Sequence, residues 1–173
     1  MGDVLIRRET AADVAAIRAV VKAAFAKPDT PDPVESPLVD WLRADEGWLP
    51  ALSLVAVVDG EVVGHVACTR GRIDAIPALG LGPLSVHPEH QGRGVGKALV
   101  HTALGAADAL GEPVMILLGS PKYYSRFDFR PASDFEIVAP DPQWGEFFQV
   151  RTLSAYDGTQ HGNFVYAEPF SRL

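Results

Sequence analysis

A glycine-dense turn between an apolar segment and an amphipathic one constrains this chain more than any other feature. The turn spans residues 91–96 and reads Gln-Gly-Arg-Gly-Val-Gly; it follows the apolar residues 81–86 and precedes a helical apolar repeat. This pattern predicts a strand, a tight loop and a helix in immediate succession. Such a loop directs several backbone N–H groups toward one point at the positive end of the helix dipole, which suits a phosphate or pyrophosphate.

Two well-known phosphate-binding motifs fail at this loop. A P-loop would need glycine and then Ser or Thr at two positions where the chain has Gln91 and Ala98. A dinucleotide fingerprint would need its third glycine where the chain has Lys97 or Leu99. A Rossmann site also normally follows the first strand, whereas this loop follows about the fourth. What remains is Gln-x-x-Gly-x-Gly at positions 91, 94 and 96.

The rest of the chain predicts a mixed α/β domain. We expect one helix that starts after a capping box at residues 10–13 and runs to Phe25, and further helices at 38–44, 94–110 and 121–127. Asp59-Gly60 is a strong signal for a tight hairpin. Residues 70–78 are expected to form a turn and sheet edge. Alternating or continuous apolar patterns predict strands at 4–8, 53–58, 61–69, 79–86, 114–118, 134–138, 147–153 and 163–166.

Composition and charge narrow the class of protein. The chain has 173 residues, 47% hydrophobic and 21% charged, so we expect one soluble domain over residues 1–173. It has 15 Lys and Arg against 22 Asp and Glu, and the net charge of −7 argues against a nucleic-acid partner. No apolar run approaches the ~20 residues of a membrane span, which argues against a membrane partner. A single cysteine, Cys68, excludes an internal disulfide and fits a cytoplasmic location.

The motifs occur in an order typical of one family. The Gln-x-x-Gly-x-Gly pattern resembles the Arg/Gln-x-x-Gly-x-Gly/Ala signature of the GNAT superfamily of acyl-CoA-dependent N-acetyltransferases. Residues 123–129, Tyr-Tyr-Ser-Arg-Phe-Asp-Phe, look like its Tyr-x-x-x-Gly-Phe segment, although Asp128 stands where the family has glycine. Residues 119–127 and the Phe-Gln-Val-x-x-Leu pattern at 148–153 are similar to the YhbS-like branch. The resemblance covers about residues 4–153 and implies a mostly antiparallel sheet, flanked by helices, whose fourth and fifth strands splay apart.

The resemblance also implies a ligand, acetyl-CoA, used as the acyl donor. Backbone N–H groups of residues 93–97 would bind its pyrophosphate, and the backbone of residues 84–86 would pair with the pantetheine arm. The Val86 N–H would polarise the thioester carbonyl. The implied donor-binding residues are Leu84, Ser85, Val86, Gln91, Gly92, Arg93, Gly94, Val95, Gly96, Lys97, Ala98 and Tyr123.

Acyl transfer to an amine needs a proton donor for the leaving thiolate and a proton acceptor for the amine. Tyr124 matches the family's general-acid tyrosine, and Tyr123 is the alternative. The general base stays open among Asp74, His65 and Glu35. Both tyrosines could also serve only to pack a helix against the sheet.

Four further expectations concern a metal, Cys68, the activity and the oligomeric state. The spacing of His87 and His90 could suit a metal, but no third ligand follows, so we expect none. Cys68 is expected to be a small core residue. The expected activity is transfer of an acetyl group to a primary amine of an unknown small molecule or protein, and the alternative is a non-catalytic acyl-CoA-binding regulatory module. Dimerisation is common in the family, and a homodimer stays an open expectation.

Overall fold

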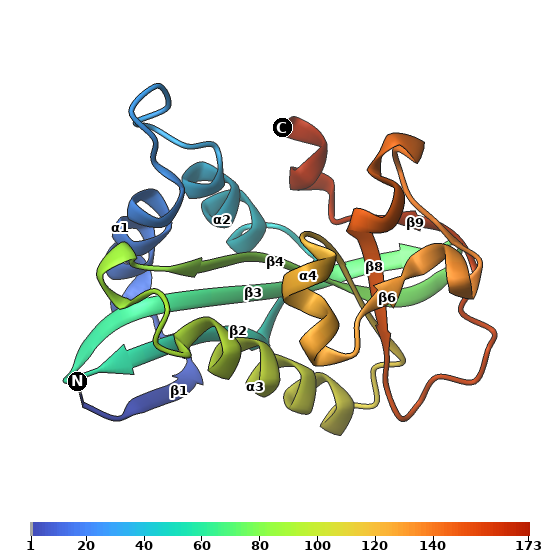
Figure 1. Cartoon of the computed structure of the whole chain (residues 1–173), viewed down its shortest axis with the longest axis horizontal. Coiled ribbons are helices and arrows are strands. Elements are labelled where there is room, and N and C mark those ends of the chain that lie inside the picture. The colour runs from blue at the N-terminus through green and yellow to red at the C-terminus, as the bar shows by residue number, and fades with distance from the viewer. Residues whose placement is uncertain (1) are drawn as a thin grey trace.

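The computed structural model describes residues 2–173, and its framework is a twisted sheet with the strand order β1-β2-β3-β4-β5-β8-β6 (Figure 1). The first four strands form an antiparallel meander: β1 (Val4–Arg8), β2 (Trp48–Val58), β3 (Glu61–Ile73) and β4 (Ile76–Val86). The later strands are β5 (Val114–Leu118), β6 (Arg130–Pro131), β7 (Ile137–Val138), β8 (Phe148–Thr152) and β9 (Gly162–Val165).

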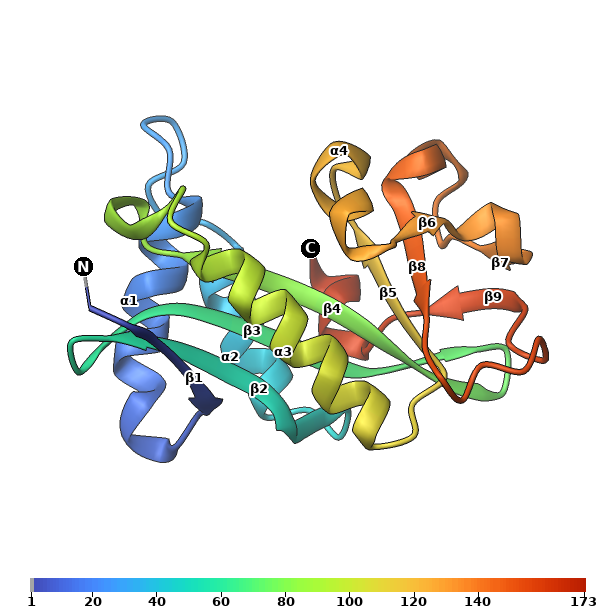
Figure 2. The ribbon, with the colours of Figure 1, turned by 60° about the horizontal axis from the view of Figure 1, so that its bottom comes forward.

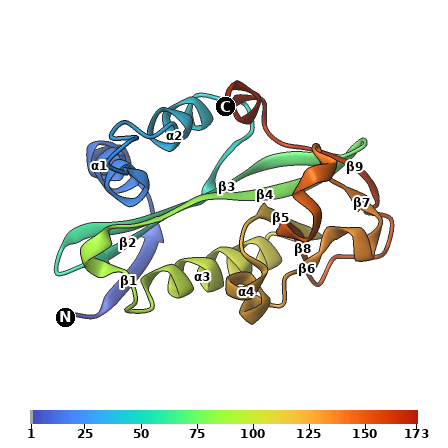
Figure 3. The same cartoon turned by 45° about the horizontal axis from the view of Figure 1, so that its top comes forward.

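Helices cover both faces of the meander (Figure 3). α1 (Val14–Phe25) and α2 (Glu35–Arg43) pack on one face, which we call the α1/α2 face. α3 (Val95–Ala109) lies on the opposite face, the α3 face. Each face has its own apolar cluster: Val55 packs with α1 and α2, whereas the residues on either side of it, Leu54 and Ala56, belong to the cluster that contains α3. The period-two alternation of a strand between two layers explains this division.

The fourth and fifth strands separate after a short parallel contact. β4 pairs with β5 only at Leu79 with Met115 and at Gly80 with Ile116. From Leu81 to Val86, β4 continues beside β3 but has no strand partner on its other edge among residues 2–173, and β4 and β5 diverge (Figure 2). The expected splayed, mostly antiparallel sheet is therefore confirmed. Its open edge exposes backbone groups that a strand-like ligand could pair with.

A β-bulge lies where this separation begins. Cys68 pairs with Leu81 and Val66 with Leu84, so two residues of β4, Gly82 and Pro83, stand opposite one residue of β3. A bulge bends its strand and increases the local twist. Apart from the Gly-Pro pair itself, no local sequence pattern indicates this irregularity.

Most expected elements are found, with differences at their boundaries. The residues expected to be a turn and edge, 70–78, mostly continue β3 and β4, because the turn itself contains only Asp74 and Ala75. α2 begins at Glu35, earlier than expected, and β2 begins at Trp48. The strand expected at 134–138 was wrong over its first half, which is a 3-10 turn.

The remaining elements are short. The helix expected at 121–127 is a single turn, α4 (Pro121–Tyr124), followed by a 3-10 turn at Ser125–Phe127. Near the C-terminus, β9 pairs with β3 and with β7. No helix within residues 2–173 has the length and apolar character needed to cross a bilayer. Other 3-10 turns occur at Ala11–Asp13, Pro88–His90, Ala132–Phe135, Pro142–Phe147 and Glu168–Arg172.

Candidate active site

The glycine loop forms the N-terminus of α3, as the sequence predicts. Gly94 is the N-cap residue and has left-handed backbone angles, with φ of 83° and ψ of 7°. The first hydrogen bond of the helix joins the Ala98 N–H to the Gly94 carbonyl at 3.0 Å. The N–H groups of Val95, Gly96 and Lys97 therefore have no carbonyl partner within the helix. Three backbone donors at a helix N-terminus form a site for an anion.

A side chain holds this loop against the end of β4. The Gln91 Nε2 amide donates a 3.0 Å hydrogen bond to the Val86 carbonyl, the last of the strand. The His87 N–H in turn donates to the Val63 carbonyl of β3 at 2.9 Å. These two bonds fix the path of the chain from the open β4 edge to the helix N-terminus. They give Gln91 a structural role in addition to any contact with a ligand.

The α4 segment lies across the splay from this loop. The Tyr123 hydroxyl comes close to the first turn of α3, since a Cβ added to Gly96 would lie 3.1 Å from it. Burial raises the pKa of Tyr123, and the nearby Arg126 guanidinium, stacked 4.7 Å from its ring centre, opposes this shift. Tyr123 is thus next to the predicted pyrophosphate site, and its binding to the donor stays a prediction.

Tyr124 lies at the C-terminal end of β5. Its ring packs on Gly119, where an added Cβ would lie only 2.6 Å from a ring carbon, and against the ring of Phe129 at 5.7 Å. Burial, followed by the neighbouring Tyr123, raises the pKa of Tyr124 to about 12. The phenol is therefore protonated throughout the physiological range, as a proton donor must be.

A large cavity of about 1460 Å³ opens beside Tyr124. It contacts both sides of the splay, through Leu84 of β4 and Leu118 of β5. Its wall is mainly aromatic and apolar, with several acidic groups at its margins. Among the residues that line it are Phe25, Glu35, Asp45, Glu46, Arg70, Arg72, Trp144, Phe164, Tyr166, Glu168 and Phe170.

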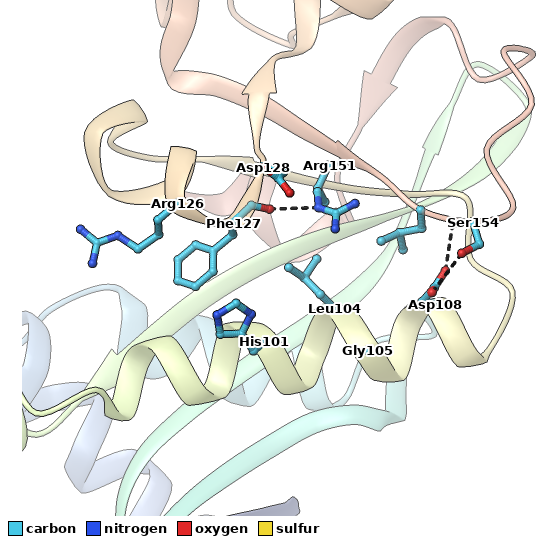
Figure 4. Close-up of a pocket in the computed structure, with 10 residues that line it drawn as sticks. His101, Leu104, Gly105, Asp108, Arg126, Phe127, Asp128, Arg151 and Ser154 are labelled. Carbon is cyan, nitrogen blue, oxygen red and sulfur yellow. Dashed lines mark hydrogen bonds between the residues drawn. The ribbon is translucent and has the colours of Figure 1, made fainter.

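A smaller, polar pocket of about 330 Å³ lies on the α3 face (Figure 4). Its lining includes His101 and Asp108 of α3 together with Phe127 and Arg151, and the rings of His101 and Phe127 meet edge to face at 5.0 Å. Arg151 Nε donates to the Phe127 carbonyl at 2.9 Å, and the Ser154 N–H and hydroxyl both donate to the Asp108 carboxylate. These bonds connect the turn after α4 to β8 and β8 to α3, so they hold the two tyrosines in position.

A buried polar row crosses the sheet on the α1/α2 face. Glu9, just after β1, accepts hydrogen bonds from Arg43 Nε at 2.9 Å and from the hydroxyl of Ser53. His65 Nε2 lies 3.0 Å from both the Glu9 carboxylate and the Ser53 Oγ. Burial alone would raise the pKa of Glu9, but the hydrogen bonds from His65, Arg43 and Ser53 outweigh it and lower that pKa to about 2. For His65, which is fully buried, burial lowers the pKa, and the Glu9 carboxylate opposes this shift.

The structure separates the three candidate bases. Asp74 lies in the β3–β4 turn, where its carboxylate accepts the Asn163 N–H at 3.0 Å, away from Tyr124. Glu35 lines the large cavity. His65 lies on β3 under α1, opposite Ser85 of β4. No local sequence pattern points to Glu9, Ser53 or Arg43. Their contacts with one another and with His65 join residues 12 to 56 positions apart.

The remaining predicted residues are also located. Cys68 is buried in the core, and burial raises the pKa of its thiol to about 12. His87 Nδ1 accepts the Glu89 N–H at 3.2 Å, and the rings of His87 and His90 meet edge to face. Within residues 2–173, no group of three or more His, Cys, Asp or Glu side chains is placed to hold a metal ion.

Comparison with known proteins agrees with this geometry. A family model described as an acetyltransferase (GNAT) domain matches residues 5–132. The chain is 33% identical over 174 residues to the uncharacterized N-acetyltransferase YhbS of Escherichia coli K12, covering 98% of this chain and 99% of YhbS. It is 37% identical over 143 residues to the uncharacterized N-acetyltransferase YjhQ of the same organism, covering 78% of this chain and 79% of YjhQ.

Two solved structures are similar over nearly the whole chain. The 1.55 Å crystal structure of Escherichia coli YhbS in complex with CoA has a TM-score of 0.88 at 30% identity, covering 100% of this chain and 94% of that one. A GNAT-family acetyltransferase from Brucella melitensis, in complex with acetyl-CoA, has a TM-score of 0.78 at 32% identity, covering 98% and 99%. The splayed sheet, the glycine loop and these matches together show that the chain belongs to the GNAT family of acetyltransferases.

Proposed function

We propose that this protein transfers the acetyl group of acetyl-CoA directly to a primary amine. The observation that carries the proposal is the arrangement around the splay. The unpaired β4 edge leads to three backbone donors at the start of α3, and the protonated Tyr124 lines the same cavity as Leu84 of β4 and Leu118 of β5. The crystal structures of the two similar acetyltransferases with CoA and acetyl-CoA support this donor.

Each part of acetyl-CoA has a group of the protein that can bind it. The N–H groups of Val95, Gly96 and Lys97 bind the pyrophosphate, with hydrogen bonds worth about 1.5–3 kcal/mol each because the acceptor is charged. The pantetheine arm, which carries amide groups, pairs with the free edge of residues 81–86 as an added strand. The thioester then lies in the splay near Tyr124, and the Val86 N–H polarises its carbonyl.

Tyr124 protonates the leaving thiolate. When the amine attacks the thioester carbon, the C–S bond of the tetrahedral intermediate breaks and the sulfur takes the phenolic proton. The amine must first lose a proton, because an ammonium of pKa ~10.4 is neutral in only about one molecule in 2,500 at pH 7. This deficit corresponds to about 4.6 kcal/mol, so a proton acceptor near the acceptor amine is needed.

The large cavity suits a cationic acceptor with an apolar portion. Its acidic lining residues Glu35, Asp45, Glu46 and Glu168 outnumber its two arginines, and Arg70 already pairs with Glu112 at 2.5 Å. Aromatic side chains such as Trp144 and Phe170 supply apolar and cation–π contact area. A small amine, a protein N-terminus and a lysine side chain all have this chemistry.

The test is acetyl-CoA turnover against a panel of primary amines: ethanolamine, benzylamine, cadaverine and a lysine-containing peptide. Free thiol release that depends on the amine, with mass-spectrometric detection of the acetylated product, is the expected result. Calorimetry with CoA is run on the same sample. Tight CoA binding without turnover of any amine would instead favour a non-catalytic acyl-CoA-binding module.

A further inference from the structure

Two buried polar atoms on adjacent strands have no protein partner among the described residues. They are the Nδ1 of His65 on β3 and the hydroxyl of Ser85 on β4. Both residues are almost completely buried, at 0% and 1% exposure. A buried polar atom left unpaired costs about 1–3 kcal/mol, so such atoms call for an explanation.

The strand register brings the two side chains together. His65 is the direct cross-strand partner of Ser85, so both lie on the α1/α2 face with Cβ atoms about 4.5–5.5 Å apart. At that separation a side-chain rotation or one water molecule joins a hydroxyl to an imidazole nitrogen. Ser85 also lies within the β4 segment that has no strand partner on its outer edge. It directly follows Leu84, which lines the large cavity.

The Glu9 end of the row fixes the histidine tautomer. The Glu9 carboxylate, ionised because its pKa is about 2, can only accept hydrogen bonds. Ser53 uses its hydroxyl proton to bind Glu9, so the Nε2 of His65 must carry a proton to satisfy both neighbours. In the neutral ring, Nδ1 is then a bare basic nitrogen, and the Ser85 hydroxyl is a donor that complements it.

We propose that Ser85, His65 and Glu9 form a proton relay that deprotonates the acceptor amine. This inference rests on the proposed function. A water molecule at the cavity wall beside Leu84 connects the acceptor nitrogen to the buried Ser85 hydroxyl. His65 receives the proton, and Glu9 is a positioning residue that fixes the imidazole and stabilises its charged form. The order matches that of a serine, histidine and carboxylate triad, here used to move a proton rather than to form an acyl-enzyme.

The protons balance as follows. The ammonium gives one proton through this water molecule to the Ser85 oxygen, and the Ser85 proton passes to His65 Nδ1, directly or through a second water molecule. The neutral amine forms the C–N bond, and the C–S bond breaks as Tyr124 protonates the thiolate. The second nitrogen proton restores the phenol, and the imidazolium returns its proton through Ser85 and the water molecule at the cavity wall to solvent. The products are the amide, free CoA and one proton.

The charges around His65 favour this role. From β1, Glu9 stabilises the imidazolium; from α2, Arg43 opposes it, and Arg43 also pairs with Asp40. The cationic groups of α1, Arg18 and Lys22, are in surface ion pairs with Asp40 and Asp32. From β2 the Ser53 hydroxyl contacts the ring, and from β4 the cross-strand neighbour is Ser85; neither hydroxyl titrates. His65 is therefore neutral before it receives the proton.

The first test needs no acceptor. With ¹⁵N-labelled histidine at neutral pH, the His65 ring should give one protonated nitrogen, Nε2, and one unprotonated nitrogen, Nδ1. S85A should shift the Nδ1 resonance and leave the exposed His161 unchanged. An imidazolium at neutral pH, or a ring protonated on Nδ1, would overturn the relay.

The second test uses the amine that the wild-type protein acetylates best. S85A, which removes one oxygen and keeps the fold, should lower kcat about 100-fold near neutral pH without changing the Kd for CoA. E9Q should lower kcat by a similar factor, and E9D should retain part of the kcat that E9Q loses. The deficit of S85A should shrink to less than about tenfold as the pH approaches ~10, where roughly a quarter of an amine of pKa ~10.4 is already neutral.

The matched control is S133A, at an exposed serine, which should behave like the wild type at every pH. A merely structural role for Ser85 would lower the rate by the same factor across the pH range and would contradict the relay. If the wild type acetylates none of the amines, the proposed function itself fails, and the relay fails with it. If the wild type is active and S85A is equally active, only the relay fails.

Discussion

Arg151 of β8 holds the carbonyl of Phe127, the residue that ends the segment carrying Tyr123 and Tyr124. The Nε-to-oxygen distance is 2.9 Å, and the guanidinium lies between the turn after α4 and α3 (Figure 4). α4 is a single turn, too short to be stable by its own hydrogen bonds. Its position therefore depends on such contacts from neighbouring elements.

Removing this contact should loosen the tyrosines more than it unfolds the protein. For R151A we expect a loss of about 1 kcal/mol in the free energy of unfolding, as for one hydrogen bond. We also expect a several-fold lower kcat, because Tyr124 is less well placed. Denaturation and steady-state kinetics measure the two effects. R130A, at an exposed arginine of the neighbouring β6, is the control, and equal losses in both variants would contradict this role.

Two glycines of the α3 region should respond in opposite directions to the same substitution. G94A forces alanine into a left-handed conformation at the N-cap, at a cost of about 1–2 kcal/mol, and should weaken CoA binding at least tenfold. G105A, inside α3 with open space around its added methyl group, should raise stability by about 0.5–1 kcal/mol and leave CoA binding unchanged. Thermal unfolding and calorimetry provide the readouts. Similar effects from both would refute the N-terminal site.

The fold was predictable wherever a local pattern determines the structure. The Asp59-Gly60 turn joins β2 to β3 as expected, with both residues at positive φ, and the glycine loop opens α3 within one residue of its predicted start. The bulge at Gly82 and Pro83 and the split of residues 70–78 between two strands were not predictable. They depend on how β4 pairs with distant residues, and strand pairing overrides local preference.

The same division applies to the candidate site. Tyr124 and the loop could be found because their spacing lies within short motifs. His65 appeared only as one of three open candidates for the base, and Glu9 did not appear at all. Their contact joins residues 56 positions apart, and each residue type is common on a protein surface. Only the folded sheet shows that the two side chains share a buried row.

Asp128 shows how the chain tolerates a departure from the family pattern. It occupies a left-handed conformation, with φ of 63° and ψ of 22°, in which aspartate costs less than most residues and glycine costs least. D128G should therefore raise stability by about 1 kcal/mol, and D128V should lower it by about 1–2 kcal/mol. Chemical denaturation measures both variants. If D128V were more stable than the wild type, the left-handed backbone conformation would not be what limits the choice of residue at position 128.

Tyr124 should act on turnover rather than on binding. Y124F removes the proton donor and should lower kcat about 100-fold, with little change in the Kd for CoA. Because its pKa is about 12, wild-type activity should not fall through ionisation of this phenol below about pH 11. Y123F is the control, and it should lower kcat much less. A larger loss in Y123F would exchange the roles of the two tyrosines.

Acid should destabilise the fold through the buried row. The pKa of Glu9 is lowered from 4.5 to about 2, so its contribution is present above about pH 4.5 and is lost as the pH falls toward 2. The pKa of His65 is also lowered, so its contribution declines as the pH falls below its ordinary value of 6.5. Together they should make stability fall from about pH 6.5 downward.

E9Q tests the lower part of this range. Urea unfolding should show the variant less stable at pH 7, by about 3 kcal/mol at most, and less sensitive to pH between about 5 and 3. E61Q, at an exposed glutamate, should follow the wild-type curve. An unchanged acid slope in E9Q would contradict the depressed pKa.

The account depends above all on the backbone donors at the start of α3 binding the pyrophosphate of the acyl donor beside the open edge of β4. A crystal structure of the protein with CoA measures this directly. We predict pyrophosphate oxygens within hydrogen-bond distance of the N–H groups of Val95, Gly96 and Lys97, and the pantetheine arm paired with the β4 edge. CoA bound elsewhere, or failing to bind at this helix N-terminus at saturating concentration, would contradict the account.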